Sequence, residues 1–145
     1  MLQAGKGREA LVPLEQLHAL QPRDGQARNF LGIALIQAQR AKEAIPHLQA
    51  VLQMNNNNPA VHNNLASAYA QIGDSQSAAR HFQETVRLNP GHVGALGNLG
   101  ELNFSAGNYA EAAKYFNRVL QIQPGNPTAR ERLAQIAEKQ GTPGR

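Results

Sequence analysis

The sequence lacks cysteine and tryptophan, and aromatic residues make up only 5% of its 145 positions. The absence of cysteine excludes disulfide bonds and thiol chemistry. No apolar stretch approaches the roughly 20 residues of a membrane-spanning helix, and the N-terminal residues lack the apolar middle of a secretory signal. The compartment stays undecided: the cytoplasm is favoured, and the periplasm is the alternative if the chain is a fragment of a longer secreted protein.

The net charge and its distribution along the chain do not indicate a particular function either. The formal net charge is +4 with histidine neutral, and both signs are spread along the chain without a run of either. Such a balance bears on solubility and on non-specific attraction, and it does not indicate a fold.

The sequence does contain an internal repeat of 34 residues. Several series of chemically similar residues recur at that interval, and a period of this length is typical of helical repeat arrays. The series are Ala10, Ala44, Ala78, Ala112; Leu31, Leu65, Leu99, Leu133; the small residues that follow these leucines, Gly32, Ala66, Gly100, Ala134; Leu14, Leu48, Phe82, Phe116; Leu20, Met54, Leu88, Ile122; and Pro22, Asn56, Pro90, Pro124.

Each unit reads as two helices joined by a tight turn. Leu65 and Tyr69 share one helical face, and Gly73 then supplies the open conformation that ends the first helix. The second helix ends at Asn89-Pro90, because proline cannot continue a helix comfortably. Asn58-Pro59 and Asn126-Pro127 match an N-cap followed by proline in the first turn. Gly107, Gly5 and Gly141 occupy the register of Gly73, so turns are predicted there as well.

The segment from Asn64 to Pro90 resembles the tetratricopeptide repeat at its leucine, small, tyrosine, glycine, alanine, aromatic and proline positions. The segment from Asn98 to Pro124 is similar but has Asn103 where the family prefers an aromatic residue. The resemblance implies an all-α, right-handed α-solenoid of antiparallel helix pairs. It implies one domain over 1–141, with complete repeats at 25–58, 59–92 and 93–126.

The two ends of the chain fall out of phase with the repeat. Only the second helix of a first repeat, about Arg8–Leu20, is predicted within 1–24, and a lone capping helix is predicted over 127–141. Residues 142–145 are predicted to be a disordered tail. The chain is therefore interpreted as a fragment of a longer protein.

In such solenoids the face of the first helices that is not buried between neighbours forms a continuous stripe, which lines the concave inner groove. At about 100° per residue, this stripe lies opposite the buried face of each first helix. Most of its side chains are amides, hydroxyls or small groups, which can pair with the backbone of an extended peptide. The predicted ligand-binding residues are Asn29, Ile33, Gln37, Asn63, Asn64, Ser67, Gln71, Asn98, Glu101, Phe104 and Arg132.

Two peptide-binding modes can be compared at this stripe. Asn64 and Asn98 share a repeat position, similar to the asparagine ladder of the O-linked N-acetylglucosamine transferase superhelix, but Phe30 and Arg132 stand where further members would be. The carboxylate clamp of tetratricopeptide co-chaperones needs lysines on the stripe to bind acidic chain ends. Both lysines are missing, so the clamp is disfavoured.

The predicted function is therefore a non-catalytic scaffold that binds a partner protein or peptide. The alternatives are a substrate-recruiting segment of a larger enzyme, such as a glycosyltransferase, and a self-assembling scaffold. No catalytic pair, cofactor or metal site is predicted, and the five histidines are expected at the surface. Nucleic-acid binding is not expected, because the stripe of the complete repeats carries no cation for phosphate. A homodimer could form through an exposed N-terminal edge at Leu11, Leu14 and Leu17.

Overall fold

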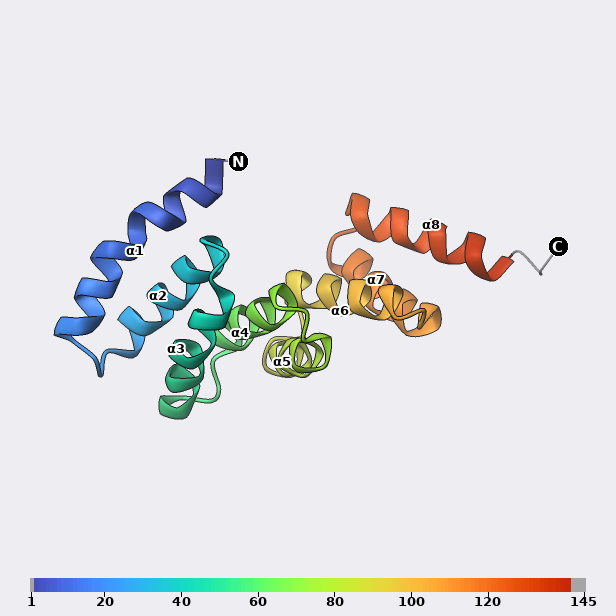
Figure 1. Ribbon diagram of the computed structural model, residues 1–145. Helices are drawn as coiled ribbons and strands as arrows, with labels where there is room; N and C mark the ends of the chain where they lie inside the picture. Colours follow the sequence, from blue (N-terminus) through green and yellow to red (C-terminus); the bar gives the residue numbers. More distant parts are fainter. Residues whose placement is uncertain (1, 142–145) are drawn as a thin grey trace. The chain divides into compact units, whose positions relative to one another are not determined.

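The computed structural model describes residues 2–141, with side chains from Glu9 onward, and every regular element among them is an α-helix. The all-α repeat fold is thus confirmed, and three helix pairs, α2–α3, α4–α5 and α6–α7, follow one another along the chain (Figure 1). The helices are α1 (Leu2–Leu20), α2 (Gly25–Gln37), α3 (Ala41–Met54), α4 (Pro59–Gln71), α5 (Ser75–Leu88), α6 (Val93–Ser105), α7 (Tyr109–Ile122) and α8 (Pro127–Gly141).

The chain forms two compact units, which meet in the sequence between Leu88 and Asn89. In unit 1, α1 packs against α2, α2 against α3 and α4, α3 against α4, and α4 against α5. In unit 2, α6 packs against α7, and α7 packs against α8. Each unit therefore buries its apolar faces between helices that are neighbours in the sequence, as expected for a repeat array.

The predicted caps at Asn58 and Asn126 and the predicted turns at Gly73 and Gly107 are present. Asn58 accepts hydrogen bonds from the backbone N–H groups of Ala60 and Val61, and Asn126 accepts one from Ala129. Gly73 and Gly107 have φ angles of 84° and 79°, in the left-handed region that glycine enters without steric cost. The equivalent position of the preceding repeat is Gln39, with φ 63°, where a side chain makes the same conformation less favourable.

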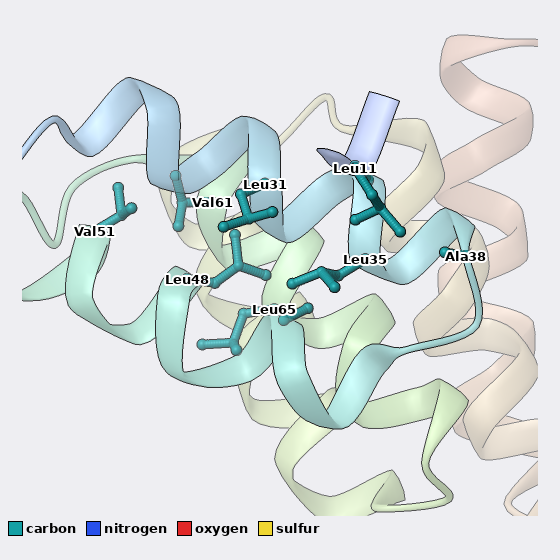
Figure 2. Packing of buried hydrophobic residues seen from close by; sticks show 10 residues of the cluster. Leu11, Leu31, Leu35, Ala38, Leu48, Val51, Val61 and Leu65 are labelled. Atoms are coloured by element: carbon teal, nitrogen blue, oxygen red, sulfur yellow. The ribbon is translucent and has the colours of Figure 1, made fainter. Parts of the chain in front are cut away.

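The core of unit 1 lies between α2, α3 and α4 (Figure 2). Leu31 and Leu35 of α2 meet Leu48 of α3 and Leu65 of α4, and all four are at most 2% exposed. A Cβ atom added to Gly32 would lie 2.7 Å from Leu48 Cδ2. The small residue after each leucine is therefore required where the two helices of a pair approach closely.

Unit 2 repeats this packing with an aromatic residue. Leu96 and Leu99 of α6 are buried, and so is Phe116 of α7, which is 1% exposed. A Cβ atom on Gly100 would lie 2.7 Å from Phe116 Cε1. Glycine at 100 thus makes room for the aromatic ring, just as Gly32 makes room for Leu48.

Three expectations about the ends need correction or fall outside the structure. Helix α1 begins at Leu2 rather than near Arg8, and Gly5 lies inside it. Gly141 is the last residue of α8 rather than a separate turn. A glycine inside a helix costs only about 1 kcal/mol relative to alanine, so Gly5 alone does not interrupt a helix of 19 residues. The predicted tail at 142–145 lies outside the described residues.

Candidate functional site

In unit 1 the predicted stripe lies on α2 and α4, which are in contact. Asn29, Asn63 and Asn64 are half-buried, as are Ile33 and Ser67, whereas Gln37 and Gln71 are exposed. The stripe can therefore be reached from solvent, although its side chains are partly buried because those of the two adjacent first helices cover one another.

The polar groups of this stripe are only partly engaged within the chain. Asn64 Nδ2 donates to Asn29 Oδ1 across 3.4 Å, which is long for a hydrogen bond. Gln71 Nε2 donates to the carbonyl oxygen of Ile36 at 3.2 Å. Asn63 Oδ1 is buried without a hydrogen-bond partner in unit 1. An unpaired buried amide oxygen is energetically costly, and Asn63 would gain a hydrogen bond if its side chain turned toward a donor on a ligand.

In unit 2 the stripe lies on α6 and α8 and has a different chemistry. Asn98 is exposed, and Phe104 is half-buried. Arg132 of α8 pairs side-on with Glu101 of α6: its Nε donates to Glu101 Oε1 at 2.8 Å and its Nη2 to Oε2 at 2.9 Å. This two-pronged geometry is the strong form of an arginine–carboxylate pair.

Two further contacts hold the Arg132 guanidinium. Its Nη1 donates to Gln135 Oε1 at 2.8 Å, and its Cζ lies 4.8 Å from the centre of the Phe104 ring, within reach of a cation–π interaction. The hydrogen bonds to Glu101 raise the pKa of Arg132 above its ordinary value. Phe104 itself meets the Tyr109 ring edge-on at 5.4 Å. One edge of the guanidinium is therefore held by the Glu101 carboxylate, and one of its faces lies against the Phe104 ring.

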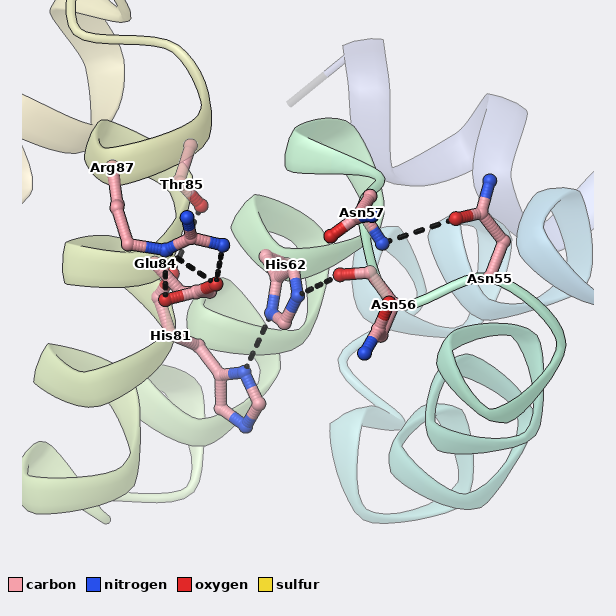
Figure 3. A network of polar contacts seen from close by, with 8 residues as sticks. All are labelled: Asn55, Asn56, Asn57, His62, His81, Glu84, Thr85 and Arg87. Carbon is pink, nitrogen blue, oxygen red and sulfur yellow. Dashed lines mark hydrogen bonds and ion pairs between the residues drawn. The ribbon is translucent and has the colours of Figure 1, made fainter.

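The histidines do not all lie at the surface, which corrects the sequence-based expectation. His62 is only 8% exposed, because the α4–α5 packing covers it. Its Nδ1 faces His81 Nδ1 at 3.1 Å, and its Nε2 lies 2.8 Å from the carbonyl oxygen of Asn56 (Figure 3). Since a carbonyl only accepts, His62 Nε2 carries the hydrogen, and His81 Nδ1 must donate to His62 Nδ1. His81 also stacks on Tyr69.

Burial is the main reason why the pKa of His81 lies below its ordinary value, and His62 and Arg80 lower it further, whereas Glu84 raises it. The pKa of His47 is lowered in the same way, first by burial and then by His18 and Arg28. His47 and His18 meet edge-on, with ring centres 5.0 Å apart. The lowered pKa values of His81 and His47 favour the neutral form of these two imidazoles.

Among residues 2–141, no three or more His, Asp or Glu side chains gather where they could hold a metal ion. In the same range, no helix has the length and apolarity to cross a membrane.

The helix pairs and the residues that space them match a known family. The model of the tetratricopeptide repeat matches residues 2–59 and 63–127. This chain belongs to the tetratricopeptide repeat family. No curated protein matches it significantly, but many solved structures do.

Three of these structures show how closely this chain resembles solved tetratricopeptide proteins in fold. A crystal structure of MamA is 21% identical, with a TM-score of 0.87 over 94% of this chain and 80% of that one. The first repeat domain of Spaghetti (RPAP3), bound to the HSP90 peptide SRMEEVD, is 24% identical, with a TM-score of 0.76 over 81% of this chain and 94% of that one. YrrB, described as having an unusual peptide-binding site, is 24% identical, with a TM-score of 0.79 over 88% and 66%.

Sequence reasoning identified the stripe but missed how its members pair. It compared Asn64 with Asn98 as members of a ladder and did not identify the contact of Asn64 with Asn29 within unit 1. It named Glu101 and Arg132 separately, without their ion pair. Opposite charges at 101 and 132, roughly one repeat apart, were the available signal.

Proposed function

We propose that this tetratricopeptide chain is a non-catalytic interaction module that binds an extended segment of a partner protein. The stripe on α2 and α4 would provide one binding face, and the stripe on α6 and α8 would provide another. The supporting observation is the amide group of unit 1, in which Asn63 Oδ1 is buried and unpaired and the Asn64–Asn29 contact is long. Such groups can exchange hydrogen bonds with any peptide backbone, independently of its side chains.

Two structural neighbours agree with this reading at the level of the fold. One was solved with a bound HSP90 peptide, and another is described by its peptide-binding site. Peptide binding by members of the same fold supports a protein-interaction role, although a shared fold does not by itself transfer a ligand. The assignment of residues 1–141 to one functional domain stays a prediction.

Selection from a displayed library of random peptides, followed by affinity measurement, tests the proposal. Asn64→Ala combined with Asn98→Ala should weaken selected peptides at least tenfold while leaving the helical content unchanged. Asn117→Ala serves as the matched control, because Asn117 is exposed on α7, away from the stripe. Equal affinities for the double variant and the control would refute peptide binding by these asparagines.

Self-association is a second candidate, favoured by the exposure of α1. Leu17 is 38% exposed, whereas its equivalents Val51, Thr85 and Val119 are 8%, 0% and 2% exposed. Among the described helices, α3, α5 and α7 each pack against the first helix of their own repeat, whereas α1 packs against α2 of the following repeat. Leu11 does not belong to this edge, contrary to the sequence-based expectation, since it is buried at 6% exposure.

A homodimer through α1 would cover Leu17 and Leu20, which is 80% exposed. Sedimentation over a range of concentrations should then show a dimer that Leu17→Gln weakens. Ile122→Gln removes a similarly exposed apolar residue on α7 and should leave the dimer intact. A monomer at all concentrations would refute this candidate.

A further inference from the structure

The Glu101–Arg132 pair occupies the stripe of unit 2 and consists of two charges that are both partly accessible. The side chains are 35% and 31% exposed, so a ligand lying on α6 and α8 would touch them. Arg132 carries the strongest anion-recognising group on this stripe, because guanidinium presents N–H donors in a fork that matches a carboxylate.

The N–H donors with which Arg132 could bind a carboxylate are already engaged within the chain. Of the five N–H groups of a guanidinium, the side-on pair on Nε and Nη2 is taken by the two oxygens of Glu101. A third is taken by Gln135, and the Phe104 ring covers one face. A ligand carboxylate would have to displace Glu101 from this position, and it would also meet the negative charge of Glu101 at close range.

We propose that Glu101 is a specificity-determining residue, which fills the carboxylate-binding fork of Arg132 and so prevents the unit 2 face from binding acidic peptide ends. This inference rests on the proposed function, because it concerns which peptide segments bind to the stripe on α6 and α8. The side chain of Glu101 acts as an internal substitute for a ligand carboxylate. The wild-type face is therefore suited to neutral segments, and removal of Glu101 would expose an arginine that Phe104 and Gln135 already hold in place.

The matched control is Glu111 on α7, which pairs with Lys114 at 2.8 Å. Glu111→Ala removes the same charge from the same unit and also frees a cation, but this lysine is 71% exposed. A gain caused only by the change in net charge would appear equally in both variants. A gain caused by the fork of Arg132 would appear only when Glu101 is replaced.

The probe is a short glutamate-rich peptide with a fluorescent label and a free C-terminal carboxylate, measured by fluorescence anisotropy. Glu101→Ala should bind it at least tenfold more tightly than the wild type and than Glu111→Ala. Adding Arg132→Ala should abolish the gain, and amidating the C-terminus of the probe should reduce it. If helical content shows that Glu101→Ala does not fold, Glu101→Gln keeps the side-chain size and replaces it in the comparison.

Two results would overturn the inference: wild-type affinity equal to that of Glu101→Ala, or a gain no larger than that of Glu111→Ala. The outcome is separate from that of the proposed function. If the peptide library gave no ligand for the wild type, the proposed function would fail, but the acidic probe would still report whether Glu101 blocks Arg132.

Discussion

Replacing Gly100 by alanine should destabilise unit 2, whereas the same replacement at Gly97 should stabilise it. Both residues lie in α6, so each alanine gains about 1 kcal/mol of helix propensity over glycine. Their surroundings differ. A Cβ atom at 97 has nothing within 4 Å, whereas one at 100 would lie 2.7 Å from Cε1 and 2.8 Å from Cζ of Phe116.

The size of the effect follows from these distances. Carbon atoms in contact are normally about 3.5–4.0 Å apart, so the new methyl group would overlap the ring. Phe116 is 1% exposed, so its ring is enclosed by protein atoms and can move away from the new methyl group only by displacing its neighbours. Overpacking of a filled core costs about 1–3 kcal/mol. The propensity gain cancels between the two variants, so Gly100→Ala should be about 1–3 kcal/mol less stable than Gly97→Ala.

Urea unfolding followed by far-ultraviolet circular dichroism measures this difference as a shift of the midpoint at constant slope. Replacing Phe116 by leucine in the Gly100→Ala background should recover part of the loss, and a double-mutant cycle would give the coupling between the two positions. Equal midpoints for Gly100→Ala and Gly97→Ala would refute the conclusion that close α6–α7 approach requires glycine at 100.

Further predictions concern a turn, a cap and the histidine pair. Gln39→Gly should raise the free energy of unfolding by up to about 1 kcal/mol, because glycine adopts the left-handed conformation without strain; in contrast, Gly73→Ala should lower it, as urea midpoints would show. Asn58→Ala should cost about 0.5–2 kcal/mol in the same assay by removing the α4 cap, and an unchanged midpoint would contradict the cap's role. Because the folded-state pKa of His81 is lowered, stability should be complete above the ordinary pKa of about 6.5 and decrease as pH falls below it. His62→Gln should reduce this decrease in part, because burial remains as the larger cause of the lowered pKa, and an identical pH profile in thermal unfolding would argue against a contribution from the His62–His81 pair.

Much of the fold could be predicted because its determinants are local. Proline after Asn58, the left-handed glycine at 73 and the four-residue spacing of Leu65 and Tyr69 act within one or two turns of chain, where the sequence alone sets the backbone geometry. The interval of 34 residues then identified the helix pairs. Even the need for a small residue at 32 and 100 was visible as a repeated position, although its partners, Leu48 and Phe116, were not assigned.

The pairing of the polar side chains was decided only by the tertiary structure. Asn29 with Asn64, Glu101 with Arg132, and His62 with His81 join residues 35, 31 and 19 positions apart. A helical wheel gives the face on which each side chain lies, but not which atoms meet, because that depends on how far neighbouring helices are shifted and rotated as their apolar faces pack. The sequence by itself determined the repeat, the helices and the stripe; packing determined that an amide cluster lines the stripe of unit 1 and a closed ion pair that of unit 2.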